Sequence, residues 1–524
     1  MKKILTTPLQ VLTATIVLFF VLETLCFLAG FPRGAGKFIE KIVIREHLSL
    51  RKPKDEFRIF TYGESTMHGS HYGPVSNPSR WLALYLKDFL PGKKIRVVNF
   101  ARMGHESGFT YRAFQDTVVY HPDLVVFYMG HNELLPDNLD SQIRCKEKKF
   151  SRKIDRLFRK SRFASVVYRL FLQWRVSTLT SKHDDSIEYR VIETNPSGFG
   201  PESVVLRNGP VYKENVENFK EKLLNILDLA EKQHVQILFF KPVGNLKDFS
   251  PYYSAHQKTL APEEISRWGS LYQQGKKAEE AGNAELARDF YEKAFLIDDT
   301  YADLSFRLGK IYFKEGELEK AKKLFEQARD DDGVVVRAST DIYEVYEELR
   351  KTRHLQLIDT EKIFRPEAPG GILGKPIIED NVHPSIKGQS LMARALAEEI
   401  AKRNWIAPME KWRFERERPF DEMARELGIT DELLFSAFLK MVHYFGSRFD
   451  NRIDYAQKAL AIHPLDPRAL RHLAWSYWLM GEKEKALEVY DKLHQIDPAS
   501  LQSVFQNQPE IQAAWHAAML QKQK

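Results

Sequence analysis

Four short segments of the sequence carry side chains that together could activate a hydroxyl group as a nucleophile. They supply Ser65 in "GEST", Gly104 in "ARMG", Asn132 in "GHNE", and Asp380 with His383 in "DNVH". Serine is a weak nucleophile at its ordinary pKa, so a base such as His383 has to take its proton. Asp380 is three residues away and can hold the imidazole in the required tautomer. The backbone N–H groups of Ser65 and Gly104 and the Asn132 amide can stabilise an oxyanion, which completes the set needed for acyl transfer from oxygen.

Each segment alone also has an ordinary structural interpretation. Ser65 could cap a helix, and Asn132 and Asp380 could be turn or cap residues. A zinc site is a second alternative, because Asp380 or His383 could bind metal together with nearby histidines. Those histidines are His68, His71, His105 and His131. Because no cysteine or closely paired carboxylates join them, the sequence predicts no metal and no other cofactor, and we expect these histidines to contact substrate or solvent.

The elements that must position these residues are strands of a parallel sheet. Five short apolar runs predict them: 57–63, 95–101, 123–130, 234–242 and 355–359. Helical patterns such as 79–90 separate them, as in sheets covered by helices on both faces. The carboxyl ends of such strands converge on the ligand-binding edge, so the first three strands bring Ser65, Gly104 and Asn132 together.

The order and spacing of the four segments resemble the SGNH (GDSL-type) hydrolases. The five-residue step from Asn99 to Gly104 and the three-residue step from Asp380 to His383 both match that family. The resemblance covers roughly residues 56–261 and 334–402. It implies a three-layer α/β/α, flavodoxin-like fold and a hydrolase that needs no metal.

Three positions depart from the family pattern. Glu64 replaces the aspartate of the first segment, Thr66 replaces its leucine, and Glu133 replaces the aspartate after the asparagine. None of the three is a reacting group. The departures therefore bear on the substrate class more than on activity.

A repeat interrupts the predicted sheet between its fourth and fifth strands. Small and aromatic residues recur with a period of 34 residues: Leu271, Gly275, Ala278, Ala287, Tyr291 and Ala294 recur as Ser305, Gly309, Tyr312, Ala321, Phe325 and Ala328. This pattern resembles tetratricopeptide repeats, as does a second pair within 431–510. We expect the pairs at 262–333 and 431–510 to be capped by the α/β core or by each other, since a stable stack usually needs three repeats. They are expected to bind a protein partner and to be dispensable for turnover.

The N-terminus predicts a membrane anchor over residues 1–35. The run at 9–30 is long enough to span a bilayer despite Glu23, and an uncleaved anchor is preferred over a cleaved signal peptide. Positive charge flanks both ends, so the positive-inside rule does not decide the orientation. We expect a bacterial inner-membrane protein whose bulk is extracytoplasmic.

Between the third and fourth strands lies a basic insert over 137–200. Its stretch 144–176 interleaves apolar residues with lysine and arginine, which suits either a solvated helix face or a helix on an anionic membrane surface. A net charge of +7 in 524 residues is modest, so no nucleic-acid partner is predicted. The two cysteines, Cys26 and Cys145, imply no disulfide framework.

Two hypotheses about function follow from the sequence. The first is a membrane-anchored serine hydrolase that cleaves or transfers an O-acyl ester of a lipid or glycan, with repeats that recruit a partner. The second is an assembly scaffold at the membrane, whose SGNH-like domain is catalytically silent or secondary. The complete set of serine, histidine, aspartate and oxyanion donors favours the enzyme.

Overall fold

The structure is a computed structural model. It describes residues 8–28, 37–135, 161–164, 166–167, 204–256, 259–445 and 448–522. Most of the basic insert over 137–200, with Cys145, lies outside these residues. Its predicted contact with a membrane surface therefore stays a prediction.

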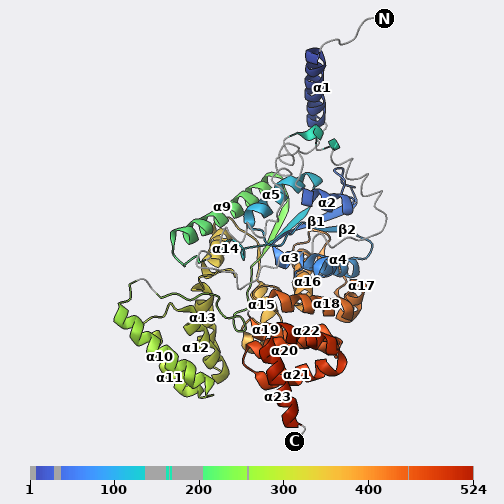
Figure 1. Cartoon of the computed structure of the whole chain (residues 1–524). Coiled ribbons are helices and arrows are strands. Elements are labelled where there is room, and N and C mark those ends of the chain that lie inside the picture. The colour runs from blue at the N-terminus through green and yellow to red at the C-terminus, as the bar shows by residue number, and fades with distance from the viewer. Residues whose placement is uncertain are drawn as a thin grey trace, which may run out of the picture.

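A five-stranded parallel sheet forms the centre of the molecule (Figure 1). Its strands are β1 (Glu56–Gly63), β2 (Lys94–Asn99), β3 (Leu124–Tyr128), β4 (Gln236–Phe240) and β5 (Leu357–Ile358). Their order in the sheet is β2-β1-β3-β4-β5, the order of flavodoxin-like folds. The parallel sheet predicted from the five apolar runs is confirmed.

Helices cover both faces of the sheet, which makes three layers (Figure 1). On one face lie α4 (Pro78–Phe89) and α16 (Ile386–Lys402); on the other lie α5 (Ser107–Thr117), α9 (Pro210–Lys232) and α14 (Thr340–Thr352). Successive residues of β3 alternate between the two cores, since side chains alternate across a strand. Leu124 and Val126 pack into the first core, and Val125 and Phe127 pack into the second. All are buried, which explains the uninterrupted apolar run.

The repeat between β4 and β5 folds as two helical hairpins. Its helices are α10 (Pro262–Glu280), α11 (Ala284–Phe295), α12 (Ala302–Glu315) and α13 (Leu318–Asp330). A Cβ added to Gly275 would lie 2.4 Å from a ring atom of Tyr291, and one added to Gly309 would lie 2.9 Å from Phe325. The recurring glycine therefore lets two helices approach closely, while the recurring aromatic ring fills the groove.

Both sets of repeats are capped by the α/β core, as predicted from their small number. Leu246 and Ile372 of the core join the hydrophobic cluster of the inserted repeats. Phe249, Tyr252 and Val336 join the cluster of the C-terminal helices.

The C-terminal segment contains more helices than the predicted pair. They are α18 (Asp431–Tyr444), α19 (Phe449–Ile462), α20 (Pro467–Leu479), α21 (Lys483–Ile496), α22 (Pro498–Asn507) and α23 (Pro509–Lys522). Figure 1 shows them in orange to red below the sheet, on the side opposite α1 (Pro8–Leu28).

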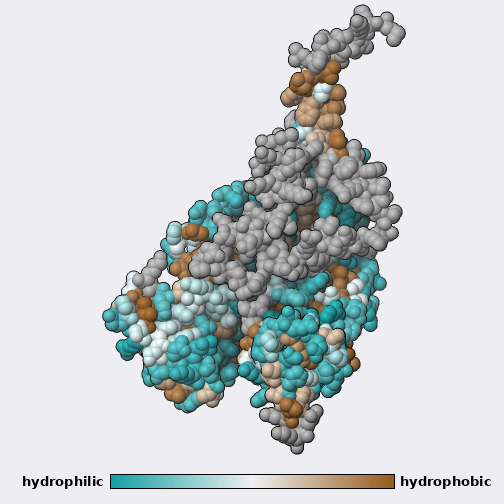
Figure 2. Space-filling model, in the orientation of Figure 1, coloured by the Kyte–Doolittle hydropathy of each residue, from teal (hydrophilic) through white to brown (hydrophobic). Residues whose placement is uncertain are grey.

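The N-terminal helix α1 projects from the body of the molecule and exposes apolar side chains along its length (Figure 2). Among the residues that the structure describes, no helix combines the length and the apolar character needed to cross a membrane. The predicted transmembrane anchor is thus not supported by the structure. It remains a prediction from the sequence.

Candidate active site

Three neighbouring strands deliver three of the predicted residues to one edge of the sheet. β1 ends at Gly63 and leads into the short helix α3 (Ser65–His68), which begins with the candidate nucleophile. β2 ends at Asn99, whose side chain donates to the Met67 carbonyl over 2.8 Å and accepts from the Ala101 N–H. The Asn99 amide therefore fixes the loop that carries Gly104 against α3.

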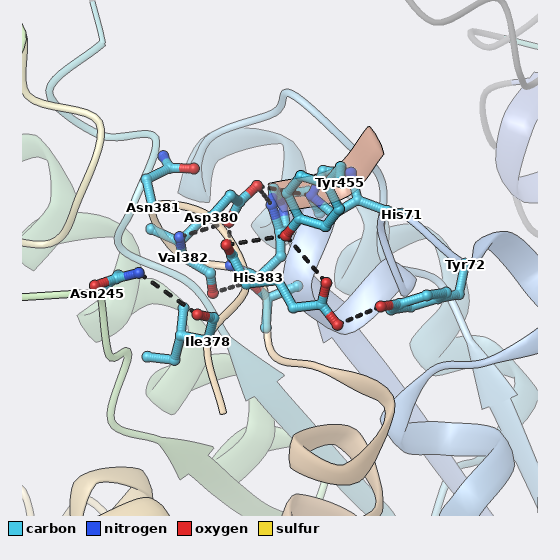
Figure 3. Close-up of polar contacts among 12 residues, drawn as sticks. His71, Tyr72, Asn245, Ile378, Asp380, Asn381, Val382, His383 and Tyr455 are labelled. Atoms are coloured by element: carbon cyan, nitrogen blue, oxygen red, sulfur yellow. Dashed lines mark hydrogen bonds and ion pairs between the residues drawn. The ribbon is translucent and has the colours of Figure 1, made fainter. Parts of the chain in front are cut away.

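Ser65, His383 and Asp380 form a continuous hydrogen-bonded chain. Ser65 Oγ lies 2.7 Å from His383 Nε2, and His383 Nδ1 lies 2.5 Å from Asp380 Oδ2. The ring can accept from the serine hydroxyl only if Nδ1 carries its proton, and the carboxylate beside Nδ1 favours that tautomer. Figure 3 shows Asp380 and His383 facing each other at the end of the 378–383 loop.

The positions of Ser65 and Asp380 bear on whether these residues serve only as helix caps or turn residues. The N-cap residue of α3 is Glu64, and Ser65 is the first helical residue. Asp380 has two roles, because its Oδ1 accepts from the N–H groups of Val382 and His383 while its Oδ2 faces the imidazole. The same side chain shapes the turn and orients the histidine.

The charge of Asp380 is strongly stabilised although the residue is buried. Burial opposes ionisation, but the neighbouring imidazoles of His383 and His71 outweigh it, through charge and hydrogen bonds, and hold the pKa of Asp380 well below its usual value. A carboxylate that stays ionised can stabilise the imidazolium that forms when His383 takes a proton.

The oxyanion candidates lie in the loops after β1, β2 and β3. Gly104 has φ of +66°, a conformation that favours glycine. Asn132 Nδ2 donates to the His105 carbonyl over 3.0 Å, and this bond uses one of its two amide hydrogens. The bond fixes the amide and leaves the second hydrogen for a ligand.

The three departures from the family pattern all have structural partners. Glu64 is buried and accepts from the N–H groups of Gly130 and His131, which ties the Ser65 loop to the loop after β3. Glu133 accepts from both the N–H and the hydroxyl of Ser107 at the start of α5. Thr66 donates to the Val382 carbonyl over 3.3 Å, which connects α3 to the His383 loop.

The other histidines of these loops differ in surroundings. Burial lowers the pKa of His131 to about 3 and that of His68 to about 4, so both rings are neutral near pH 7. His131 accepts from the Ala338 N–H and contacts the Tyr128 hydroxyl. His105 is fixed by a 2.7 Å contact between its Nδ1 and the Met103 carbonyl. These contacts indicate structural roles for His131 and His105.

His71 is the residue whose position the sequence reasoning missed. Its Nε2 lies 2.7 Å from Asp380 Oδ2, the oxygen that also faces His383. Ligand atoms of His71, Asp380 and His383 all lie within 4.8 Å of one another, as a metal site would require. However, ligands of a tetrahedral zinc ion stand roughly 3.3 Å apart at ordinary zinc–ligand lengths. The shorter separations from Asp380 fit hydrogen bonds between the side chains better than a metal site.

The C-terminal helices contact the loop that carries Asp380. The Tyr455 hydroxyl of α19 donates to Glu379, and the Tyr444 ring of α18 lies against His71. No pattern in the sequence predicted these contacts. They give a physical reason to expect that α18 and α19 matter for turnover, contrary to the expectation that the repeats are dispensable.

Comparison with protein-family models identifies the two repeat segments. Residues 278–334 and 468–500 each match the tetratricopeptide repeat family. Both segments are tetratricopeptide repeats. The first match overlaps the predicted segment 262–333 and extends one residue beyond it, and the second lies within the predicted segment 431–510.

Solved structures similar to the chain include lipases and esterases. A putative GDSL-like lipase from Parabacteroides merdae has a TM-score of 0.31 and 11% identity, covering 67% of this chain and 97% of its own. A GDSL-like lipase from Bacteroides thetaiotaomicron has a TM-score of 0.30 and 9% identity, covering 70% and 100%. An acetylxylan esterase from Geobacillus stearothermophilus has a TM-score of 0.27 and 12% identity, covering 66% and 96%.

Both lipases are described as GDSL-like, and the four sequence segments resemble the GDSL-type hydrolases. No curated protein matches the chain by sequence. With TM-scores of about 0.3, these structures do not indicate a function for the chain.

Proposed function

We propose that this chain is a serine hydrolase of the SGNH type, which cleaves or transfers an O-acyl ester through an acyl-enzyme on Ser65. The observation that carries the proposal is the chain of contacts from Ser65 Oγ to His383 Nε2 and from His383 Nδ1 to Asp380 Oδ2. A serine hydroxyl, an imidazole and a carboxylate in this order are the working parts of acyl transfer.

In the first half of the reaction, Ser65 Oγ attacks the ester carbonyl carbon while its proton passes to His383 Nε2. Asp380 stabilises the resulting imidazolium from the Nδ1 side. His383 then returns the proton to the leaving alcohol, and an acyl group remains on Ser65. In the second half, water or an acceptor hydroxyl attacks the acyl carbon while its proton passes to His383. The bond from the acyl carbon to Ser65 Oγ then breaks, Oγ takes the proton back from His383, and the carboxylic acid or the new ester leaves.

The negative charge on the carbonyl oxygen is stabilised by three proposed donors. These are the N–H groups of Ser65 and Gly104 and the amide of Asn132. Donors that are fixed before the reaction need no reorganisation when the charge develops. The hydrogen bond from Asn132 to the His105 carbonyl provides such fixation.

The substrate, location and partner are proposed from the sequence. The substrate class is an O-acyl ester of a lipid or glycan, which a panel of acetyl, short-chain and long-chain esters would test. The chain is proposed to be anchored in a membrane by residues 1–35, so that it should resist carbonate extraction until these residues are deleted. The tetratricopeptide repeats are proposed to bind a protein partner, a role for which such repeats are suited.

Labelling with a fluorophosphonate probe tests the central proposal. The probe should phosphonylate the intact chain at Ser65, and Ser65→Ala should abolish labelling. A matched control is Ser266→Ala, which removes an exposed serine from α10 and should leave labelling unchanged. A folded chain that does not react would instead support the alternative of a silent domain in an assembly scaffold.

A further inference from the structure

One oxygen of Asp380 faces two imidazoles. Its Oδ2 lies 2.5 Å from His383 Nδ1 and 2.7 Å from His71 Nε2. The two rings meet edge to face, with centroids 4.7 Å apart and planes at 79°. A triad needs only the first of these contacts. The acyl-transfer steps assigned to Ser65, His383 and Asp380 therefore do not use the contact between Asp380 and His71.

The second imidazole completes the hydrogen bonding of the carboxylate. Oδ1 of Asp380 already accepts two backbone N–H groups, at 2.9 Å from Val382 and 2.8 Å from His383. With both imidazoles donating to Oδ2, the carboxylate accepts four hydrogen bonds, which is its ordinary capacity. Rotation of the carboxylate would break several of them together. His71 thus restrains the group that orients His383.

His71 is in turn held by the C-terminal helices. Its side chain is 12% exposed, and its ring packs edge to face on Tyr444 of α18, with centroids 5.5 Å apart and planes at 67°. Burial, followed by the charge of Asp380, raises the pKa of Tyr444 well above its ordinary value, so its ring is uncharged where it meets His71.

The residues next to His71 and Asp380 in sequence are tied to the same helices. Glu379 is buried and accepts from the Tyr72 hydroxyl through one carboxylate oxygen. Its other oxygen and its backbone carbonyl each accept from Tyr455 of α19 over 3.0 Å. Figure 3 shows hydrogen bonds at the hydroxyl groups of Tyr72 and Tyr455, in the same region as His71 and Asp380. His71 and Tyr72 are successive residues of one loop, and Glu379 and Asp380 are successive residues of the other. All four are therefore held where the two loops meet α18 and α19.

We propose that His71 is a positioning residue for the catalytic carboxylate, and that Tyr444 of α18 acts through His71. The C-terminal helices then take part in orienting the base as well as in binding partners. This inference rests on the proposed function, because a positioning role needs a base that reacts. It assigns no bond-forming step to His71 or Tyr444.

Substitutions at His71 test the first half of the proposal. His71→Leu should lower kcat by about 10-fold to 100-fold, the range seen when a group that orients a functional side chain is removed. KM should change little, since a residue that acts by orienting Asp380 affects the base rather than substrate binding. His71→Gln retains an N–H donor near the position of Nε2 and should restore most of kcat. Equal rates for His71→Leu and the unmodified chain would contradict the proposal.

The chain offers a matched control at a second histidine–aspartate pair. His256 Nδ1 lies 2.7 Å from Asp298, and its ring packs edge to face on Trp268 with centroids 4.5 Å apart. The chemistry resembles that of His71, but the pair lies beside the inserted repeats. His256→Leu should leave kcat unchanged. A loss equal to that of His71→Leu would mean that both variants act through general destabilisation.

A double-mutant comparison tests whether Tyr444 acts through His71. Tyr444→Leu should lower kcat, whereas Tyr444→Phe keeps the ring and should remain near the unmodified rate. In the His71→Leu background, Tyr444→Leu should cause no further loss, because residues in contact are not additive. Losses that multiply in full would show that Tyr444 acts by another route.

Proton NMR of the full chain, with labelled histidine, separates this inference from the proposed function. Two low-field imidazole N–H protons are expected from the rings bound to Asp380, in addition to the one from the pair of His256 and Asp298, which His256→Leu identifies. His71→Gln should remove one of them, and Tyr444→Leu should shift that same one. If Ser65 fails to react with fluorophosphonate while both signals behave in this way, the proposed function is wrong and the positioning pair stands. If Ser65 reacts but only one such proton is present, the positioning inference is wrong.

Discussion

The carboxyl groups of Glu64 and Glu133 interact electrostatically beside the loop that carries Ser65. Glu64 is buried and also accepts from the N–H groups of Gly130 and His131, while Glu133 accepts from Ser107. Two neighbouring carboxylates disfavour each other's charge, so the pair tends to hold a proton. The hydrogen bonds of the two side chains together join the loops after β1, β2 and β3.

The stability of the chain is expected to depend on this proton. Burial, followed by the charge of Glu133, raises the pKa of Glu64 well above its ordinary value, and burial chiefly raises the pKa of Glu133 to about 7. A raised carboxyl pKa means that the folded state holds the proton more tightly than the unfolded state. The contribution of this pair to the free energy of unfolding is therefore fully present below about pH 4.5 and is lost as the pH rises through about 7.

Glu133→Gln should remove part of this pH dependence. The loss of unfolding free energy between about pH 4.5 and 7 should shrink by on the order of 2 kcal/mol, as judged from urea titrations at several pH values. Glu280→Gln, at an exposed position of α10, is the control and should keep the original slope. If the dependence of the unfolding free energy on pH were unchanged in Glu133→Gln, Glu133 would not be its source.

The three residues of the hydrogen-bonded chain should differ in the severity of their loss. Ser65→Ala removes the covalent route, and His383→Ala should cost nearly as much kcat because the two act as a unit. Asp380→Ala should be milder, since Asp380 orients and stabilises the imidazole without forming a bond to substrate. Steady-state hydrolysis of a small soluble ester measures the order. Full activity in Ser65→Ala would remove the proposed nucleophile.

Asn132→Ala should lower kcat by about 10²–10³ and change KM little, because its amide is aimed at charge that develops only in the transition state. The same ester assay, run across substrate concentrations, separates the two parameters. Asn225→Ala removes an amide from an exposed contact on α9 and serves as control. A rise in KM at constant kcat would indicate that Asn132 binds the ground state instead.

The inserted repeats allow a comparison of two glycines on one helix. Gly275→Ala places a Cβ 2.4 Å from Tyr291 and should destabilise the repeats by about 1–3 kcal/mol through overpacking. Gly269→Ala meets no atom within 4 Å and should stabilise α10 by roughly 0.5–1 kcal/mol, because alanine is the better helix former. Thermal unfolding of the two variants should therefore shift in opposite directions.

The sequence by itself determined the type of fold and the residues of the candidate triad. Apolar strand runs and a repeat of fixed period report local periodicity, and periodicity decides which segments form strands and paired helices. The candidate site residues could be selected because residues at the carboxyl ends of adjacent parallel strands must meet. The 34-residue repeat also gave the two hairpins a glycine and an aromatic residue at matching positions, and in the structure Gly275 lies against Tyr291.

Only the tertiary structure decided what surrounds those residues. His71 and Tyr444 lie far apart in the chain, and no spacing rule relates them to Asp380 or to each other. Their contacts depend on how the C-terminal helices pack on the core through Phe249 and Tyr252, which is a property of the whole surface. Likewise, the raised pKa values of Glu64 and Glu133 follow from burial and from neighbouring charges, which a sequence does not contain. Local pattern thus fixes which elements form, whereas long-range packing fixes which charges meet.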